Sequence, residues 1–414
     1  MTRSALALVA VGVALLLPGT GSGAQQVPIS YHAYTTAADF GSGTFAGTTV
    51  ANGALALAKE GTASVTYTDG HYGDIPAVAG RWTSPMYATG FGFTELVASW
   101  NADTPSGSWL QVEMRGVTDQ GHLTKYNVMG RWAYDDDTIF RTSVGGQGDA
   151  DGYVSIDTFF AKDHPLTQYQ LRVTLYREAG SAARPTLRRV GAVASDAPNE
   201  KPYIPSPLGG AEGITLNVPQ FSQEIHSGQY PQYDGGGEAW CSPTSTLMVV
   251  AYWDALPRAT EWSWVDPSYA DPWVDNTARH VFDYHYNGTG NWPFNTAYAG
   301  GRGLDAFVTQ LHNLTEAEQF IKAGIPLVAS IAAEPNKLTG FLFRGTDGHL
   351  LVIVGFDRAG NVVVNDPAET SDASVRKVYD RAEFENAWLP ATGGVVYVMK
   401  PAGVSLPSGS GGNW

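Results

Sequence analysis

Hydrophobic and polar residues alternate in short runs through residues 27–190, and this pattern predicts β-strands. The clearest run is 168–176, in which Leu171, Val173 and Leu175 would face one side of a strand and the intervening polar residues the other. Other alternating runs occupy residues 53–57, 63–67, 108–115 and 153–159. Glycine, aspartate and asparagine separate these runs, so we expect an all-β domain, either a two-sheet sandwich or a jelly roll.

The pattern changes after residue 215, where helical and strand-like segments are mixed. An apolar stretch that opens at Cys241 predicts a helix, and residues 304–311 also have helical spacing. A further helix is expected from Thr315 to a stop at Gly324. Apolar runs that predict strands follow at residues 325–331, 349–356, 361–366 and 394–399. Helices followed by an antiparallel sheet indicate an α+β domain over residues 215–402.

Chain length supports two domains. Without a leader the chain has about 390 residues, more than one core usually holds. The predicted boundary is residues 191–213, which contain four prolines and show no apolar periodicity, as expected of an extended, solvated linker. Residues 403–414 are rich in glycine and serine and are expected to form a flexible tail.

Residues 1–24 have the pattern of a secretory signal peptide. Arg3 supplies a positive charge, residues 5–17 are apolar but too short to span a bilayer, and Ser22 and Ala24 are small residues before a cleavage site. The alternative is an uncleaved membrane anchor. We expect the chain to be secreted, with no membrane span after cleavage.

The formal net charge of −15 becomes −16 when Arg3 is removed with the leader. This acidity argues against nucleic acid or an anionic membrane as a partner, since both require a basic surface. Charged residues make up only 16% and aromatic residues 12%, with 48 glycines, a composition typical of β-rich, turn-rich proteins.

Cys241 is the single cysteine, and it stands at the predicted start of a helix. A helix N-terminus lowers the pKa of a thiol and favours the nucleophilic thiolate. Most free cysteines are instead buried small hydrophobic residues. His349 leads one predicted strand and Asp366 ends the next, so a hairpin could bring a base and its orienting carboxylate together.

Four motifs now show a resemblance to a known family. They are residues 218–223 (Val-Pro-Gln-Phe-Ser-Gln), 241–245 (Cys-Ser-Pro-Thr-Ser), 348–349 (Gly-His) and 365–367 (Asn-Asp-Pro). In this order they resemble the C39-like peptidases, a papain-like cysteine peptidase group, over about residues 215–400.

The resemblance implies a papain-like α+β fold and hydrolysis of peptide or amide bonds through a thioester acyl-enzyme. It makes Cys241 the nucleophile, His349 the base and Asp366 the residue that orients the base. Gln223 would donate a hydrogen bond in the oxyanion hole, with Gln220 as the second choice. The family usually has glycine where Ser242 stands.

Residues 235–237 (Gly-Gly-Gly) lie in an unusually long interval between Gln223 and Cys241. This loop could shape a substrate groove or act as a flap. Residues 291–295 with Tyr298 could line the same groove, or could form a structured loop packed by its aromatic side chains.

The expected substrate is a peptide or protein, and no cofactor or metal is expected. Other activities on the same three residues stay open: a cell-wall amidase, a deamidase or a transacylase. So does a catalytically inactive protein that binds a cell surface or carbohydrate. In the N-terminal domain four tryptophans could stack on sugars or could be core residues: Trp82, Trp100, Trp109 and Trp132.

Three groups of residues could ligate metal, but none has strong ligand spacing. Residues 135–137 and 148–152 are aspartate-rich and could hold calcium, although solvated turns fit them better because they lack a spaced calcium loop. His280 and His285 are five residues apart with no third ligand marked, which is weak for a metal site.

Overall fold

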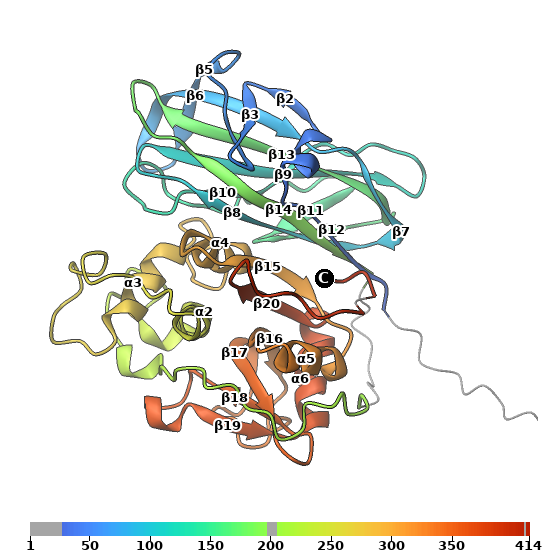
Figure 1. Ribbon diagram of the computed structural model, residues 1–414, viewed down its shortest axis with the longest axis vertical. Helices are drawn as coiled ribbons and strands as arrows, with labels where there is room; N and C mark the ends of the chain where they lie inside the picture. Colours follow the sequence, from blue (N-terminus) through green and yellow to red (C-terminus); the bar gives the residue numbers. More distant parts are fainter. Residues whose placement is uncertain (1–26, 197–204, 410) are drawn as a thin grey trace, which may run out of the picture.

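The computed structural model describes residues 27–196, 205–409 and 411–414. The predicted signal peptide, residues 1–24, lies outside the described residues. In Figure 1 the N-terminal part, coloured blue to green, forms a layered β structure above the C-terminal part, coloured yellow-green to red. The carboxyl end of the chain lies where the two parts meet.

The N-terminal part contains two seven-stranded antiparallel sheets and one short helix, α1 (Ala37–Gly41). The first sheet has the order β11 (Gly152–Ser155), β12 (Thr158–Ala161), β8 (Glu95–Asp103), β14 (Thr186–Ser195), β4 (Ala54–Leu57) and β3 (Thr48–Ala51), with β1 (Ile29–Tyr34) paired to β14. The second has the order β10 (Asn127–Trp132), β9 (Ser108–Thr118), β13 (Leu166–Glu178), β6 (Gly73–Thr83) and β2 (Thr44–Ala46), with β5 (Ala63–Asp69) on β6 and β7 (Tyr87–Phe93) on β13.

One hydrophobic cluster joins residues of both sheets. Leu171, Val173 and Leu175 are fully buried in it, as their alternation predicted. The four tryptophans considered as sugar platforms have no exposed surface, so the sugar-stacking interpretation of Trp82, Trp100, Trp109 and Trp132 is wrong. Trp82, Trp100 and Trp132 belong to this inter-sheet cluster, whereas Trp109 packs in a separate cluster with Tyr67 and Ile139. At each of these positions a large apolar ring gains from burial.

The run 153–159 is two strands rather than one. Ile156 has a φ of +56° and Asp157 follows it, so the chain turns between β11 and β12. This turn could not be predicted from the sequence, because an isoleucine rarely adopts a left-handed backbone conformation.

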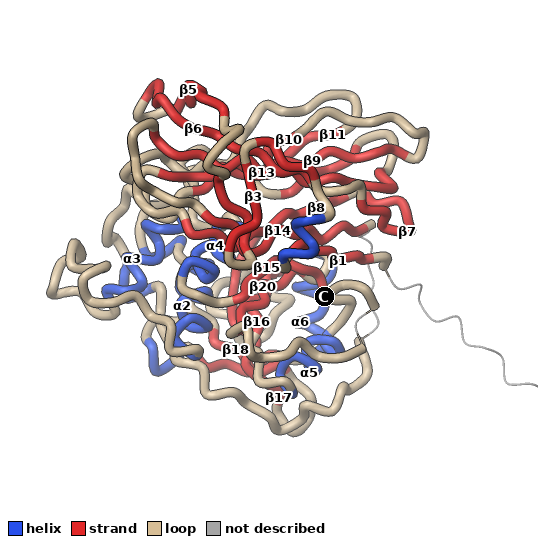
Figure 2. Tube along the Cα trace, turned by 45° about the horizontal axis from the view of Figure 1, so that its top comes forward, coloured by secondary structure: helices blue, strands red, loops and turns tan. Residues whose placement is uncertain are grey.

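The C-terminal part contains one six-stranded antiparallel sheet. Its order is β15 (Asp305–Gln310), β20 (Val395–Lys400), β16 (Leu327–Ala333), β17 (Thr346–Phe356), β18 (Val362–Asn365) and β19 (Arg376–Tyr379). Figure 2 shows the longer helices flanking these strands. They are α2 (Cys241–Tyr252), α3 (Pro272–Val281), α4 (Trp292–Gly301), α5 (Leu314–Lys322) and α6 (Arg381–Thr392), with short 3-10 turns η1 (Glu224–His226), η2 (Gly237–Ala239) and η3 (Asp372–Ser374).

Within residues 304–311 the chain forms strand β15 (Asp305–Gln310), so the prediction of a helix there is wrong. Ala306 and Val308 pack in one hydrophobic cluster while Phe307 packs in another, on the opposite face of the sheet. A strand buried on both faces is apolar throughout and cannot be told from a helix by spacing alone. The helix expected from Thr315 exists as α5, but Asn313 caps it, accepting a hydrogen bond from the backbone N–H of Glu316.

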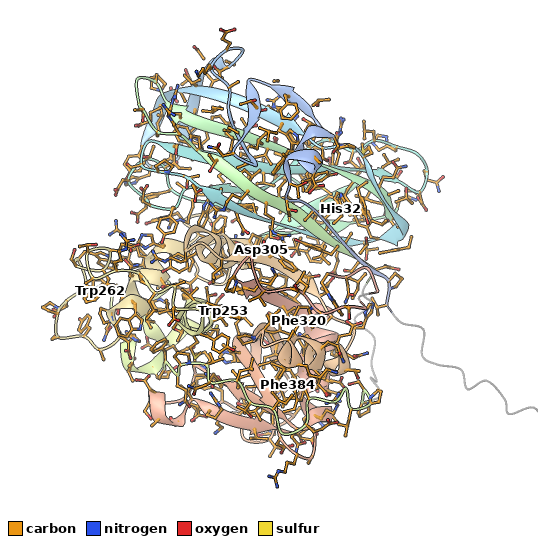
Figure 3. All side chains as sticks on the ribbon, in the orientation of Figure 1. His32, Trp253, Trp262, Asp305, Phe320 and Phe384 are labelled. Carbon is orange, nitrogen blue, oxygen red and sulfur yellow. The ribbon has the colours of Figure 1, made fainter. Side chains whose placement is uncertain are left out.

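The two parts of the molecule share buried polar contacts. The side-chain amide of Asn101 on β8 exchanges two hydrogen bonds with the backbone of Ala306 on β15. Asp305, labelled at the boundary between the parts in Figure 3, binds the guanidinium of Arg189 through both carboxylate oxygens. Asp305 Oδ2 also lies 3.1 Å from Lys400 Nζ. These contacts join β15 to the first sheet of the N-terminal part.

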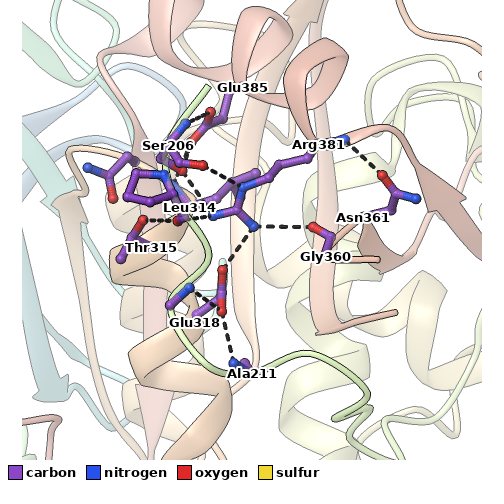
Figure 4. Close-up of polar contacts among 12 residues, drawn as sticks. Ser206, Ala211, Leu314, Thr315, Glu318, Gly360, Asn361, Arg381 and Glu385 are labelled. Carbon is purple, nitrogen blue, oxygen red and sulfur yellow. Dashed lines mark hydrogen bonds and ion pairs between the residues drawn. The ribbon is translucent and has the colours of Figure 1, made fainter. Parts of the chain in front are cut away.

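The second half of the predicted linker is packed rather than solvated. Ser206 binds the Glu385 carboxylate and accepts hydrogen bonds from Arg381, as Figure 4 shows. The backbone N–H of Ala211 donates to Glu318, which also pairs with Arg381 at 2.8 Å. Residues 191–195 belong to β14. Only the middle of the predicted linker, residues 197–204, lies outside the described residues.

The expected flexible tail is also packed. Asn413 is fully buried, and its amide donates to Gln310 O and Glu316 Oε2. Gly412 O accepts a hydrogen bond from Tyr31 N on β1, so the tail contacts both parts. The glycine and serine content of the tail predicted mobility, but composition cannot show that one asparagine side chain forms buried hydrogen bonds with the rest of the chain.

The prediction of a mainly β protein with antiparallel sheets and some helices is confirmed. The division into two domains, and the finer fold of each, stay predictions. Within the described residues no helix has the length and apolar character that crossing a bilayer requires.

Candidate active site

Cys241 is the first residue of α2, as the sequence predicted. The helix is buried almost all round, from Ser242 to Ala251, and packs beside β17. Such a central helix is apolar on every side, which explains its uniform sequence. Cys241 itself is half-buried and lies at the positive end of the helix dipole.

His349 on β17 and Asp366 after β18 form a buried pair. The Nε2 atom of His349 lies 2.7 Å from Asp366 Oδ1. The register explains the contact: Val352 pairs with Asn365, so the next residue, Asp366, comes opposite Leu351, two residues from His349 on the same face. Because Nε2 binds the carboxylate, Nδ1 is left for Cys241.

Burial lowers the pKa of His349, but the Asp366 carboxylate beside it and the Cys241 side chain raise it, to about 10. For Asp366, burial raises the pKa, but the His349 imidazole and the Tyr379 hydroxyl more than offset this and hold it below its usual value. The two shifts favour an imidazolium–carboxylate pair next to the thiol.

In NMR spectra the His349 imidazole is expected to titrate near pH 10 rather than at its ordinary 6.5. Because the folded pKa is raised, the ion pair stabilises the fold fully below pH 6.5, and this contribution is lost as pH rises through about 10. Asp366→Asn should lower the pKa of His349 by about one to three pH units. Asp357→Asn, in a turn of the same sheet, is the control, and an unchanged His349 titration in Asp366→Asn would contradict the pairing.

Two residues that contact the His349–Asp366 pair were not predicted from the sequence. Tyr379 on β19 donates its hydroxyl proton to Asp366 Oδ2 at 2.7 Å. Phe341, in the loop between β16 and β17, places its ring 5.4 Å from the His349 ring. No sequence motif identifies Tyr379 or Phe341. Tyr379 lies on β19, the strand that pairs with β18 just before Asp366, and it stands opposite Val362 in that pairing.

Gln223 lies beside the segment that leads to Cys241. Its Nε2 donates to Glu238 O at 2.7 Å, and its second N–H makes a longer contact of 3.3 Å with Glu224. Within the described part of the chain, the side chain of Gln220 forms no hydrogen bond to residues 238–241, unlike that of Gln223. The geometry therefore favours Gln223 over Gln220 as the residue near Cys241.

The glycines before Cys241 allow this approach. A Cβ atom on Gly237 would stand 2.4 Å from Gln223 O, too close for any side chain. Gly236 has a φ of +114°, which other residues rarely adopt. The glycine run is therefore a tightly packed turn that brings Gln223 against the start of α2.

Ser242 replaces the glycine expected after the cysteine, and the structure accounts for it. Its hydroxyl is buried, 3.0 Å from the hydroxyl of Tyr397 on β20. Tyr397 supplies the polar partner that a buried serine requires. The side chain of Ser242 is turned into the core, so it does not occupy the surroundings of the thiol.

Ser242→Ala is expected to destabilise the fold by about 1–2 kcal/mol, because Tyr397 would keep a buried hydroxyl without its partner. The free energy of unfolding in urea measures this. Ser242→Ala with Tyr397→Phe should cost less than the sum of the single changes, since the double variant leaves no orphaned hydroxyl. Additive costs would show that the two hydroxyls do not depend on each other.

Other candidate residues do not converge on Cys241. His280 bonds to Asn276 O and His285 to Gly145 N, on separate contacts. Asp136 forms an ion pair with Arg279, and no group of three or more metal-ligating side chains exists among the described residues. Residues 291–295 begin helix α4, capped by Asn291, and Phe294, Asn295 and Tyr298 are fully buried rather than lining a groove.

Comparison with protein families agrees with this geometry. Residues 215–396 match the Peptidase_C39 like family. The resemblance to the C39-like peptidases is confirmed. Residues 30–195 match a second family, the Peptidase C39 N-terminal domain, so the N-terminal part of this C39-like chain is also of a known type. None of the curated proteins compared with the chain matches it.

Several solved structures show remote similarity to the chain. A crystal structure described as a C39-like peptidase from Bacillus anthracis is 16% identical, covers 46% of this chain and 98% of its own, and has a TM-score of 0.29. An infectious bursal disease virus structure is 13% identical, covers 46% of this chain and 36% of its own, and has a TM-score of 0.20. A Clostridium thermocellum xylanase with its carbohydrate-binding module is 8% identical, covers 48% of this chain and 31% of its own, and has a TM-score of 0.21. Scores this low carry no argument.

Proposed function

We propose that this chain is a secreted cysteine peptidase that hydrolyses peptide or amide bonds through an acyl-enzyme on Cys241. The observation that carries the proposal is the buried His349–Asp366 pair, whose imidazole interacts with the half-buried thiol of Cys241 at the start of a helix. The match of residues 215–396 to a C39-like family supports the same chemistry.

In the first step the Cys241 thiolate attacks the carbonyl carbon of the scissile bond. The tetrahedral intermediate collapses as the His349 imidazolium gives its proton to the leaving amine, and a thioester remains on Cys241. Water then gives a proton to His349 and its oxygen attacks the thioester, which releases the carboxylic acid and the thiolate. Asp366 stays ionised throughout and keeps the ring of His349 oriented.

Two donors suit the oxyanion that forms in each step. The backbone N–H of Cys241 opens α2 and has no partner within the helix. Gln223 can supply the second donor from its amide, whose 3.3 Å contact with Glu224 is long enough to be exchanged for an oxyanion. A donor of this kind contributes roughly 3 kcal/mol to the transition state.

We further propose that residues 1–24 direct export and that the chain comprises an N-terminal β-sandwich domain and a papain-like C-terminal domain. The sandwich supports its partner through the shared contacts at β15.

The acyl-enzyme can be tested directly. The protein is mixed with a peptide library, quenched in acid within milliseconds and analysed by mass spectrometry. We expect an acyl group on the fragment that contains Cys241, removable by hydroxylamine, which cleaves thioesters. Hydrolysis that proceeds with no adduct on Cys241 would overturn the proposal, as would an intact library.

A further inference from the structure

A cleft of about 890 Å³ in the N-terminal part of the molecule carries an excess of positive charge. The β3–β4 hairpin and the connection from β13 to β14 line it. Its lining includes four cationic side chains, Lys59, Arg177, Arg184 and Arg188, against one carboxylate, Asp103. The whole chain has 40 acidic and only 25 basic residues, so the cleft opposes the charge of the protein around it.

Most of these cations have no carboxylate partner. Arg188 pairs with Asp103 and donates to Gly300 O at 2.6 Å. Among the described residues, no ion pair is formed by Lys59, Arg177 or Arg184. The Nε atom of Arg177 is moreover buried and lacks a hydrogen-bond partner. Buried donors are nearly always satisfied, so the guanidinium of Arg177 keeps unused hydrogen-bonding capacity at the wall of the cleft.

The shape of the cleft suits an extended ligand. Asn52 and Gly53 have φ values of +51° and +81°, the backbone of a tight two-residue hairpin turn, and alanines flank the turn. These small residues leave open space, while Thr49 and Thr62 add hydroxyl groups to the lining. Guanidinium groups bind phosphate and carboxylate through two parallel hydrogen bonds.

We propose that this cleft binds a polymer whose repeating units carry phosphate or carboxylate groups together with hydroxyl groups. The cations would hold the oxyanions, and the threonines would bond to the hydroxyls. None of the lining residues lies on the elements that carry Cys241, His349 or Asp366, so this site is separate from the peptide-cleaving site.

The test measures binding of the full chain at low salt to three fluorescent polymers. Poly(glycerol phosphate) carries phosphate and hydroxyl groups, polygalacturonate carries carboxylate and hydroxyl groups, and polyglutamate carries carboxylates on a peptide backbone. The variants are Arg184→Glu and the double variant Lys59→Glu with Arg184→Glu, because both side chains are exposed. Arg358→Glu, exposed in the C-terminal part, is the matched control.

The expected result is binding to one or both hydroxyl-bearing polymers, which identifies the source of the oxyanion, with affinity falling as salt rises. Arg184→Glu should weaken it about tenfold and the double variant further, whereas Arg358→Glu and the rate of peptide cleavage should not change. Binding only to polyglutamate, equal binding by the double variant, or no binding by the natural chain would each overturn the proposal.

Discussion

Cys241→Ala is expected to lower kcat for peptide hydrolysis by about 10⁴-fold or more, because removing the nucleophile of such a triad removes the whole covalent route. Binding of the peptide should persist, since alanine keeps the backbone N–H that opens α2. The measurement is the rate of cleavage of library peptides, with an intact fold established by circular dichroism. Activity within tenfold of the natural chain would exclude Cys241 as the nucleophile.

The matched control is the neighbouring change, Ser242→Gly, which restores the residue that the C39-like family usually has. Ser242 is turned toward Tyr397 and away from the thiol, so kcat should stay within a few-fold while stability falls. If Ser242→Gly abolished cleavage as fully as Cys241→Ala, the loss would be attributed to the start of α2 as a whole rather than to the thiol.

The residues around this thiol could be predicted to different degrees. Cys241, His349 and Asp366 each stand at the end of a strongly patterned apolar segment, and their motifs occur in a fixed order. The pairing of β17 with β18 then makes the contact between His349 and Asp366 almost unavoidable. Tyr379 could not be found in this way, because β19 is short and only its last residue is buried.

Sequence patterns also failed wherever two segments distant in the chain bury one another. The sequence of β15 predicts a helix because both of its faces are buried. Phe307 packs within the C-terminal part, while Ala306 and Val308 pack in a cluster that also includes residues of the N-terminal part. Residues 205–213 read as a linker because their hydrogen bonds go to Glu318 and Arg381, which are more than a hundred residues away. The spacing of apolar residues shows only which positions of a segment face the core and which face water. It does not reveal which distant segment covers the buried positions.

Asp305 provides the clearest case of a residue whose importance is set by distant partners. Burial raises its pKa, but Arg189 and Lys400 outweigh that effect and hold the pKa below its usual 3.8. The side chains of Arg189 and Lys400 are only 11% and 6% exposed. Removing the carboxylate would therefore leave two cations close together and poorly hydrated between the two parts of the molecule.

Asp305→Ala is accordingly expected to destabilise the fold by about 3 kcal/mol, in the range for breaking one side of a buried ion pair. Urea unfolding at pH 7 measures the loss. Asp103→Ala is the control: its carboxylate is 52% exposed and its partner Arg188 keeps Gly300 O, so about 0–1 kcal/mol is expected. Because the pKa of Asp305 is lowered, its stabilisation is present above 3.8 and fades as pH falls below that value, where the natural chain and Asp305→Ala should converge. Equal losses for both variants at pH 7 would show that the contact at β15 does not hold the two parts together.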